Sequence, residues 1–456
     1  MIVENHHYFV NVVIIKNATV NRVVGGFAYG NKIMASEVSS RGFKAVKPGL
    51  SYLDIYIQSL QDAYHPVSNS SGYICLTVAE NKLAYEDLMA PKIRECHEIL
   101  GKSAVMSSDE FAPFYNDMKG IMQFRSNIAA MMQKDMGYKF KPENVICQSG
   151  CGSVVDMLGW MLCNAGDACL IPTPFYPAFF NDLFVRSEVK VIPVPTHKHM
   201  NFEVCVEDLE NSYQASLKSG VIPKMILITN PGNPSGQCIP RDKLEQVLLW
   251  SRSKHLHIVV DEIYARSVYG ENNFCSIATV SKGNFGNDLH IVYGFSKDFV
   301  LSGFRVGILY SENQTLQAAM NNLSYFSSVS IDSQNVLNLM ISDLEWIDEF
   351  TLENNRRLEH SASLLTCFLD SMDVPYLLPT AGMFCCAKFS VLIKKIEFTW
   401  DDELELFNKL ATEAKVLLTP GRDCAFQEPG WYRCCFAYVL PEALNVAFER
   451  IKHLNY

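Results

Sequence analysis

Among its 15 cysteines the sequence has no Cys-x-x-Cys pair, and this absence narrows the classes of protein it could belong to. Zinc sites and redox pairs use closely spaced cysteines, so we expect neither a metal site nor a disulfide framework. The doublets Cys385-Cys386 and Cys434-Cys435 lie in apolar runs instead. That setting is typical of buried, reduced thiols, which are common in cytoplasmic enzymes, so we expect a cytoplasmic protein.

The chain also lacks an excess of basic residues and a long apolar run. Its formal net charge is −10, which argues against general binding of nucleic acid. No apolar run approaches the roughly 18 residues that a membrane-spanning helix needs, so we expect no membrane partner. Residues 8–15 are apolar, but no basic segment precedes them and Lys16 follows, so we predict no signal peptide. Met34 reads like a natural start, which would place residues 1–33 before the protein proper, and we assign residues 1–39 as an N-terminal extension of uncertain status.

A chain of 456 residues, 48% of them hydrophobic, is long enough for one large domain and a smaller one. From residue 144 onward, strand-like and helix-like patterns alternate, and the sequence has no internal repeats. The expected helices include 152–164 and 241–253, and the expected strands are 144–148, 168–172, 190–193, 225–229, 257–261, 289–293 and 306–310. This alternation predicts an α/β fold with a mostly parallel sheet, which binds ligands outside the carboxyl ends of its strands.

After about residue 330 the pattern changes to long helical stretches, such as 333–372 and 401–414, separated by short apolar segments. We interpret this part as a smaller α+β domain. The predicted organisation is a large domain over 76–330 and a small domain formed by 40–75 together with 331–456.

The most informative stretch is 293–310, where Lys297 lies in a short Gly/Ser-containing turn between two apolar runs. A lysine between buried strands is costly, because desolvation disfavours its charge. The same desolvation lowers the pKa of the amine, which favours formation of a Schiff base. A surface lysine on a loop is the plainer interpretation, but the segments upstream of it argue for the chemical one.

Two upstream segments share this arrangement of a buried strand followed by polar residues. The strand in 225–236 ends in a double Asn-Pro turn, and the strand in 256–265 ends at Asp261, with Tyr264 three residues later. Each alone could be an ordinary turn or helix cap. Together with Lys297, in this order, they resemble the class I and II aminotransferases, which use pyridoxal phosphate.

The resemblance is greatest to the 1-aminocyclopropane-1-carboxylate (ACC) synthase-like branch of that family. It rests on the pattern Ser-Lys-Asp-x-x-x-x-Gly-x-Arg-x-Gly from Ser296 and on the segment Val-Ala-Glu-Asn from Val78, and it covers about residues 45–450. It implies the type I aminotransferase-like fold, pyridoxal phosphate as cofactor, an α-amino acid as substrate and a homodimer with active sites at the subunit interface.

The resemblance also implies roles for individual residues near the cofactor ring. Lys297 would hold the aldehyde and remove the proton on the substrate Cα, and Asp261 would pair with the pyridine nitrogen. Tyr264 and Asn233 would donate hydrogen bonds to the ring oxygen. Tyr176, or its neighbour Phe175, would stack on the ring.

The phosphate and the substrate carboxylate need partners of their own. Arg305 would grip the phosphate, and the resemblance adds to it Ser296 and the turn Gly150, Cys151, Gly152 and Ser153 at a helix start. Arg433 would bind the substrate carboxylate with its planar fork, and Glu80 would lie near the substrate entrance. The plainer interpretations are a connecting turn, a surface arginine and a first-turn helix acid, respectively.

Three positions depart from the family pattern. Gly294 stands where a serine is usual, Gly152 stands where a hydroxyl residue is usual, and Met118 replaces a tyrosine that reaches the phosphate of the neighbouring subunit, with Tyr115 three residues away. Each lost hydrogen bond is worth about 0.5–1.5 kcal/mol. We expect either weaker binding of the cofactor or a cradle rebuilt from other groups, and Met118 makes ACC synthesis a weaker expectation.

The sequence leaves the reaction open. Three reactions fit it: transamination, ACC formation from S-adenosylmethionine and C–S β-elimination of a cysteine conjugate. All three begin with removal of the Cα proton, and they differ in the orientation of the bound substrate. A protein of this fold that has lost catalysis and serves in binding or regulation is the alternative from a different class.

Overall fold

The computed structural model describes residues 38–45, 50–102, 115–197, 202–270, 273–393 and 395–454. The expected start at Met34 and most of the predicted N-terminal extension lie outside these ranges. Within the described residues, none of the helices combines the length and the apolar character needed to cross a membrane.

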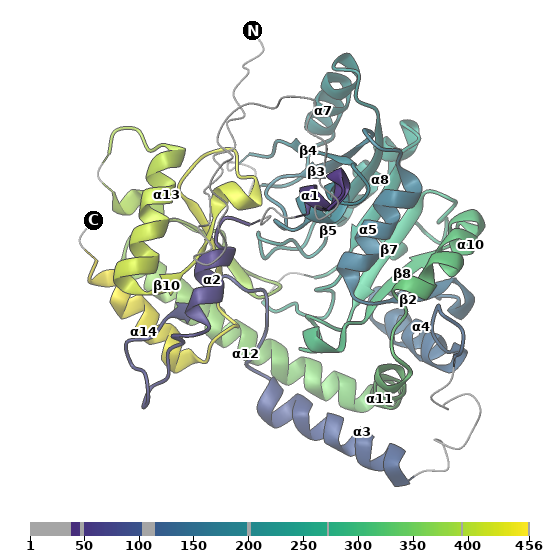
Figure 1. Cartoon of the computed structure of the whole chain (residues 1–456), viewed down its shortest axis with the longest axis horizontal. Coiled ribbons are helices and arrows are strands. Elements are labelled where there is room, and N and C mark those ends of the chain that lie inside the picture. Colours follow the sequence, from purple (N-terminus) through teal and green to yellow (C-terminus); the bar gives the residue numbers. More distant parts are fainter. Residues whose placement is uncertain are drawn as a thin grey trace.

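The larger part of the protein is built on a seven-stranded sheet in the order β2-β8-β7-β6-β5-β3-β4 (Figure 1). β8 is antiparallel to β2 and β7, and the other neighbouring strands pair in parallel, so the predicted α/β fold with a mostly parallel sheet is confirmed. The strands are β2 (Val145–Gln148), β3 (Ala168–Pro172), β4 (Lys190–Val194), β5 (Pro223–Thr229), β6 (His257–Asp261), β7 (Leu289–Gly294) and β8 (Gly307–Ser311).

Helices cover both faces of this sheet, because its strands are apolar on both sides. Along β6, Ile258 and Val260 belong to one core cluster and Val259 belongs to another, as the two-residue period of a strand requires. The helices of this part are α3 (Ala90–Lys102), α4 (Met122–Met136), α5 (Cys151–Leu162), α6 (Phe179–Phe184), α7 (Val206–Lys218), α8 (Arg241–Ser253), α9 (Ile277–Val280) and α10 (Gln314–Leu323).

The smaller part contains two short sheets. In one, β1 (Ile74–Cys75) pairs with β10 (Val416–Leu417), and in the other β12 (Trp431–Cys435) lies between β11 (Thr419–Pro420) and β9 (Phe384–Lys388). Tyr52 and Ile74 share one core cluster with residues near the end of the chain, such as Ile451. The helices here are α2 (Leu53–Ser59), α13 (Trp400–Lys409) and α14 (Pro441–Lys452), and α1 (Ser40–Lys44) precedes them in the chain.

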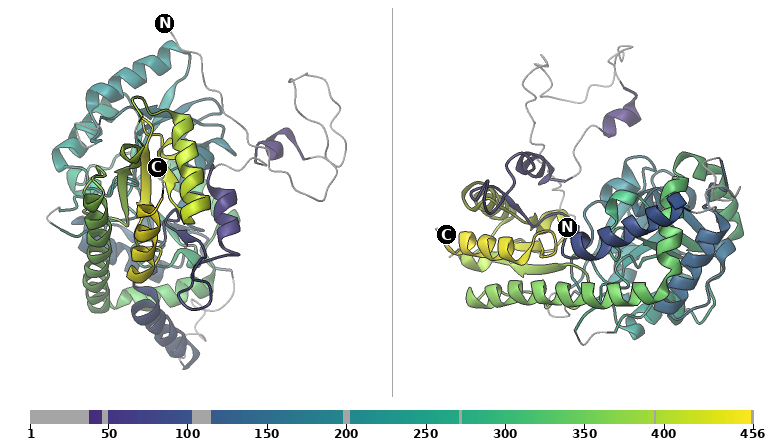
Figure 2. Two further views of the ribbon diagram at one scale, coloured as in Figure 1. Left: turned by 90° about the vertical axis from the view of Figure 1, so that its left-hand side faces the viewer. Right: turned by 90° about the horizontal axis from the view of Figure 1, so that it is seen from below.

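The predicted helical stretch 333–372 is two helices, which corrects the sequence interpretation. α11 (Ile331–Ser342) ends before Asp343, whose carboxylate accepts a hydrogen bond from the Trp346 backbone N–H at 3.1 Å and so starts α12 (Leu344–Ser371). The long α12 runs along both parts of the molecule (Figure 2, right).

Membership of the hydrophobic core clusters indicates where the two domains divide. α11 and the first turns of α12, as far as Phe350, pack in the core of the large sheet, whereas α12 from Leu358 onward packs in the core of the smaller part. The division after residue 330 stays a prediction, and we propose to place it within α12, between Phe350 and Leu358.

Candidate active site

The candidate residues gather at one edge of the large sheet. Asp261 ends β6, and Asn233 and Lys297 lie in the turns after β5 and β7; these three parallel strands all end at this edge. The turn after β2 and the entry to β8 lie at the same edge, because β8 is antiparallel to both of its neighbours. The sheet topology therefore collects these five segments, as expected for a ligand site in an α/β sheet.

Lys297 is largely buried, and its Nζ donates a hydrogen bond to the carbonyl oxygen of Ala79 at 2.5 Å. Burial lowers the pKa of this amine, while the nearby thiols of Cys435 and Cys151 and the carboxylate of Glu80 act in the opposite direction. A lysine with a lowered pKa, placed at the end of a strand, is suited to react as a nucleophilic amine.

Asp261 ends β6 and is 7% exposed. One of its carboxylate oxygens accepts a hydrogen bond from the Ile263 backbone N–H at 3.3 Å. Burial raises the pKa of this carboxyl to about 7, although that N–H and the charge of Lys297 favour the ionised form. A cationic partner would therefore be needed to hold Asp261 fully ionised near neutral pH.

Tyr264 and Asn233 meet beside Asp261. The Asn233 side-chain amide donates to the Tyr264 hydroxyl oxygen at 3.3 Å, and its carbonyl oxygen accepts from Arg433 Nη1 at 2.9 Å. Burial holds the pKa of the Tyr264 hydroxyl well above its ordinary value, so this group keeps its proton and can donate it in a hydrogen bond.

Arg433, on β12, is 1% exposed. Its Nη2 donates to the carbonyl oxygen of Thr77 at 2.5 Å and to Thr419 Oγ1 at 3.2 Å, and the guanidinium lies 4.8 Å from the Phe384 ring centroid. Its Nε has no hydrogen-bond partner, and within the described residues no carboxylate forms an ion pair with it. A buried cation with an unused donor is suited to bind an anion.

The turn after β2 makes a tight backbone cradle at the start of α5. Gly150 has φ 89°, and a Cβ there would stand 2.4 Å from Arg305 Nη2. A Cβ on Gly307 would stand 2.3 Å from the Gly150 backbone. The two glycines therefore let Arg305 and the N-terminus of α5 come close together, which is the arrangement that phosphate groups favour.

Two serines of the predicted cradle differ in their hydrogen bonds. The Ser153 hydroxyl donates to the carbonyl oxygen of Ser149 at 2.9 Å, within the first turn of the helix. The Ser296 hydroxyl has no partner among the residues that the structure describes, and Ser296 is 7% exposed. Ser296 is therefore the hydroxyl group available to a ligand at this turn.

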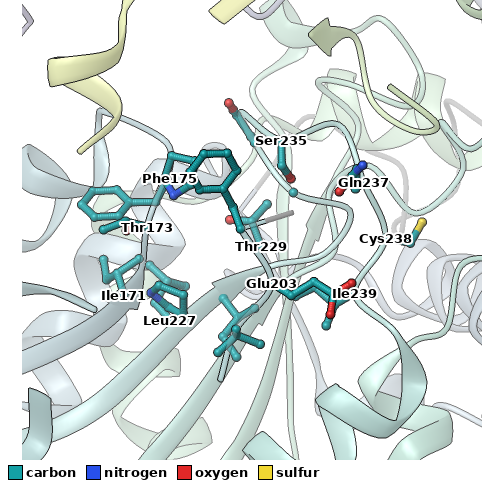
Figure 3. A pocket seen from close by; sticks show the side chains of 17 residues that line it. Ile171, Thr173, Phe175, Glu203, Leu227, Thr229, Ser235, Gln237, Cys238 and Ile239 are labelled. Carbon is teal, nitrogen blue, oxygen red and sulfur yellow. The ribbon is translucent and has the colours of Figure 1, made fainter. Parts of the chain in front are cut away.

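The structure places the aromatic alternatives Tyr176 and Phe175 differently. Burial raises the pKa of the Tyr176 hydroxyl, and the charges of Asp261, Arg305 and Arg433 also act on it. Phe175 lines a cavity of about 70 Å³, which Asn233 also lines (Figure 3). Tyr176 is therefore the aromatic residue that lies among the charged groups.

Several residues near the site were missed by sequence reasoning. Thr77 and Thr419 contact Arg433, and Ser302 donates to Glu80 Oε1 at 2.5 Å. Tyr52 is buried, and the charge of Arg433 acts on its hydroxyl. Ser302 lies inside the pattern that begins at Ser296, and Thr77 directly precedes Val78, so their positions offered a signal, whereas Tyr52 and Thr419 lie outside both motifs.

The burial and the donor chemistry of these residues fit pyridoxal phosphate. Lys297 could hold the aldehyde, Asp261 is a buried acid that needs a cation, and the turn at Gly150 with Arg305 could hold a phosphate. Arg433 retains an unused buried donor for a carboxylate. Burial and donor chemistry thus agree with the predicted cofactor and with an amino-acid substrate.

A family model described as aminotransferase class I and II matches residues 75–451. The chain belongs to the class I and II aminotransferase family. A probable aminotransferase from Arabidopsis thaliana, ACS12, is 34% identical over 438 residues, which cover 94% of this chain and 87% of that protein. An ACC synthase from rice, number 6, is 33% identical over 435 residues, which cover 92% of this chain and 79% of that protein.

Solved structures agree with the fold of this aminotransferase-family chain. The aspartate aminotransferase of Thermus thermophilus with maleate has a TM-score of 0.75 and 20% identity, and the match covers 91% of this chain and 99% of that one. The predicted family, fold and cofactor are therefore confirmed. The chain is a pyridoxal-phosphate-dependent enzyme of the aminotransferase or ACC synthase-like kind, while the roles of its individual residues stay predictions.

Proposed function

We propose that this enzyme catalyses transamination of an α-amino acid, with Lys297 as the proton carrier and Arg433 as the carboxylate anchor. The observation that carries the proposal is the fully buried guanidinium of Arg433, which has an unused Nε and is oriented by the Asn233 amide oxygen at 2.9 Å. A substrate carboxylate would satisfy both its charge and its free donor.

Each residue of the site would have its own role. Arg433 and Asn233 would bind and orient the substrate carboxylate, and the Lys297 amine would take the proton from Cα and return it at a second position. Asp261 would stay ionised against a cationic ring nitrogen, and the Tyr264 hydroxyl would donate to the ring oxygen. When bound, pyridoxal phosphate supplies the aldehyde and the electron-withdrawing ring that make the Cα proton removable.

Transamination needs only these residues, whereas ACC formation uses the tyrosine that this chain replaces with Met118. ACC formation is the second candidate, because relatives 33–34% identical over most of the chain are ACC synthases. The test is a titration of the cofactor-loaded enzyme with an amino-acid panel that includes S-adenosylmethionine and cysteine conjugates. We expect release of a keto acid; release of ACC, or of pyruvate with a thiol, would contradict transamination.

We also propose a homodimer whose interface lies beside the cradle. Tyr325 and Phe326 are 63% and 79% exposed, and the next residue, Ser327, accepts a hydrogen bond from the Ser149 backbone N–H at 2.7 Å. The Tyr325 and Phe326 ring centroids lie 5.5 Å apart. Large aromatic side chains grouped in this way are typical of a buried interface. Sedimentation of the enzyme and of a Phe326→Asp variant would test this, with a dimer expected for the first and a weakened dimer for the second.

For its compartment we propose the cytoplasm, on the basis of cysteine usage. All 15 cysteines are free, and most are buried as small apolar groups. Unpaired thiols in this number suit a reducing environment. Imaging of a tagged full-length chain in its own cells tests this, and localisation in an oxidising compartment would contradict it.

A further inference from the structure

The carboxylate of Asp298, the residue after Lys297, is 2% exposed and accepts four hydrogen bonds. Its Oδ2 accepts from the Arg266 backbone N–H at 2.9 Å and from the Tyr293 hydroxyl at 3.0 Å. Its Oδ1 accepts from the Ser267 backbone N–H at 3.1 Å and from the Ser267 hydroxyl at 2.7 Å. Both oxygens are therefore fully used, and none of the four donors belongs to a neighbouring residue of the same turn.

Three of these donors lie in the turn that follows β6. That turn begins at Asp261 and carries Tyr264, whose carbonyl oxygen accepts a hydrogen bond from the Ser267 backbone N–H at 3.0 Å. Asp298 lies in the turn that follows β7 and carries Lys297. Its carboxylate therefore connects the turn of the candidate amine with the turn of the candidate acid and phenol.

The turn after β6 is held from its other side by helices. Arg266 donates through Nη2 to the Asp135 carboxylate at 2.6 Å and through Nη1 to Thr351 Oγ1 at 2.9 Å. Asn355, also on α12, donates to the carbonyl oxygens of Arg266 and Val268, each at 2.9 Å. These contacts fix the positions of the Arg266 and Ser267 donors, so the Asp298 carboxylate that binds them is held in place as well.

We propose that Asp298 is a positioning residue, whose carboxylate sets the distance from the Lys297 amine to Asp261 and Tyr264. It acts through the backbone of two turns and does not touch substrate or cofactor. The inference rests on the proposed function, in which these three residues act on one cofactor.

An asparagine at position 298 would test this because it preserves size and removes acceptors. An ionised carboxylate can accept four hydrogen bonds on two oxygens, but an amide nitrogen only donates, so one backbone N–H would face another donor and one hydroxyl would keep its bond only by turning to accept. The two turns would then separate locally, while the rest of the sheet keeps its contacts.

The readout is the pH midpoint of the visible absorption of the cofactor-loaded protein, together with the dissociation constant for pyridoxal phosphate. In Asp298→Asn the amine would move away from the donors around Tyr264, so we expect the midpoint to rise by about one unit and cofactor binding to weaken about tenfold. Tyr293→Phe and Ser267→Ala each remove one donor, so we expect smaller changes in the same direction. Asp135→Asn, one contact further away, should lower the melting temperature and leave the midpoint unchanged.

An unchanged midpoint in Asp298→Asn with normal cofactor binding would overturn the inference. If Asp298→Asn does not fold, the single-donor variants decide, and an unchanged midpoint in both would overturn it. Equal shifts of the absorption midpoint in Asp135→Asn and Asp298→Asn would also overturn the inference, because they would indicate a general structural effect. A wild-type protein whose bound cofactor shows no pH-dependent absorption would overturn the proposed function, and the inference with it.

Discussion

The Cys151 sulfur lies 2.8 Å from the point where a Cβ on Gly294 would stand. The thiol is held there by its hydrogen bond to the Tyr293 carbonyl oxygen at 3.0 Å, and the Val306 carbonyl oxygen lies equally close to that point, at 2.8 Å. The serine that the family usually has at this position therefore has no room in this protein. The Cys151 thiol and the Val306 carbonyl oxygen therefore give a steric reason for glycine at position 294.

Gly294→Ala should destabilise the protein by about 1–3 kcal/mol, the usual cost of overpacking. Adding Cys151→Ala should recover part of that loss, but not all, because the Val306 carbonyl oxygen stays in place. Denaturant unfolding of the two single variants and the double variant measures the coupling. Gly303→Ala is the matched control, since a Cβ there meets no atom within 4 Å. Additive effects at positions 151 and 294 would contradict the relationship.

Replacement of Arg433 by lysine should weaken binding of amino acids by about 10–100-fold, because lysine keeps the charge and loses the fork. Binding is measured by titrating the visible absorption of the cofactor-loaded enzyme with an amino acid and with the matching amine that lacks the carboxylate. The amine should bind wild type and variant equally. If Arg433→Lys weakened both ligands to the same extent, Arg433 would not be the carboxylate anchor.

Lys297→Ala should abolish turnover while cofactor still binds, since the phosphate and ring contacts come from other residues. Equilibrium dialysis with pyridoxal phosphate and a keto-acid assay measure the two properties separately. Lys134→Ala, which removes an exposed lysine that is ion-paired with Asp348, is the control and should keep full activity. Retained turnover in Lys297→Ala would show that another group carries the proton.

Stability should fall on acidification because His290, at the opposite edge of the sheet, is fully buried beside the half-buried His257. His257 Nδ1 and His290 Nε2 lie 3.1 Å apart, and burial lowers the pKa of His290 from about 6.5 to about 3. Below its ordinary pKa, His290 therefore binds a proton in the unfolded chain but not in the folded protein. Its contribution to the free energy of unfolding is complete above pH 6.5 and decreases below it. At pH 5 the loss is about 2 kcal/mol.

Unfolding at pH 7.5 and at pH 5 measures this loss. His290→Gln should be less stable at the higher pH, because its hydrogen bonds change, yet should lose less on acidification. The exposed His453, replaced by glutamine, should behave like the wild type. An equal loss in wild type and His290→Gln would show that other groups cause the acid sensitivity.

The large sheet could be predicted well from the sequence, and the reasons are local. The predicted ranges 257–261 and 241–253 match β6 and α8, because continuous apolar strands and a helical apolar period are visible along the chain. The break at Asp343 could not be predicted in the same way, since the helical pattern continues through it and only the capping hydrogen bond interrupts it.

For the site, residues within strand-end motifs could be proposed from the sequence, but their long-range partners could not. The contact of Arg433 with Asn233 joins positions 200 residues apart. The four bonds of Asp298 likewise depend on how two turns face each other. Such contacts follow from the folded geometry and leave no spacing signal in the chain.

We propose above that Lys297 is the residue that holds pyridoxal phosphate in this family member. Borohydride reduction of the cofactor-loaded protein fixes the cofactor on the lysine that carries it, and peptide mass spectrometry then identifies that lysine. We expect the added mass on the peptide that contains Lys297 and its loss in Lys297→Ala. The added mass on a different lysine, or on none after visible binding of cofactor, would show that Lys297 does not hold the cofactor.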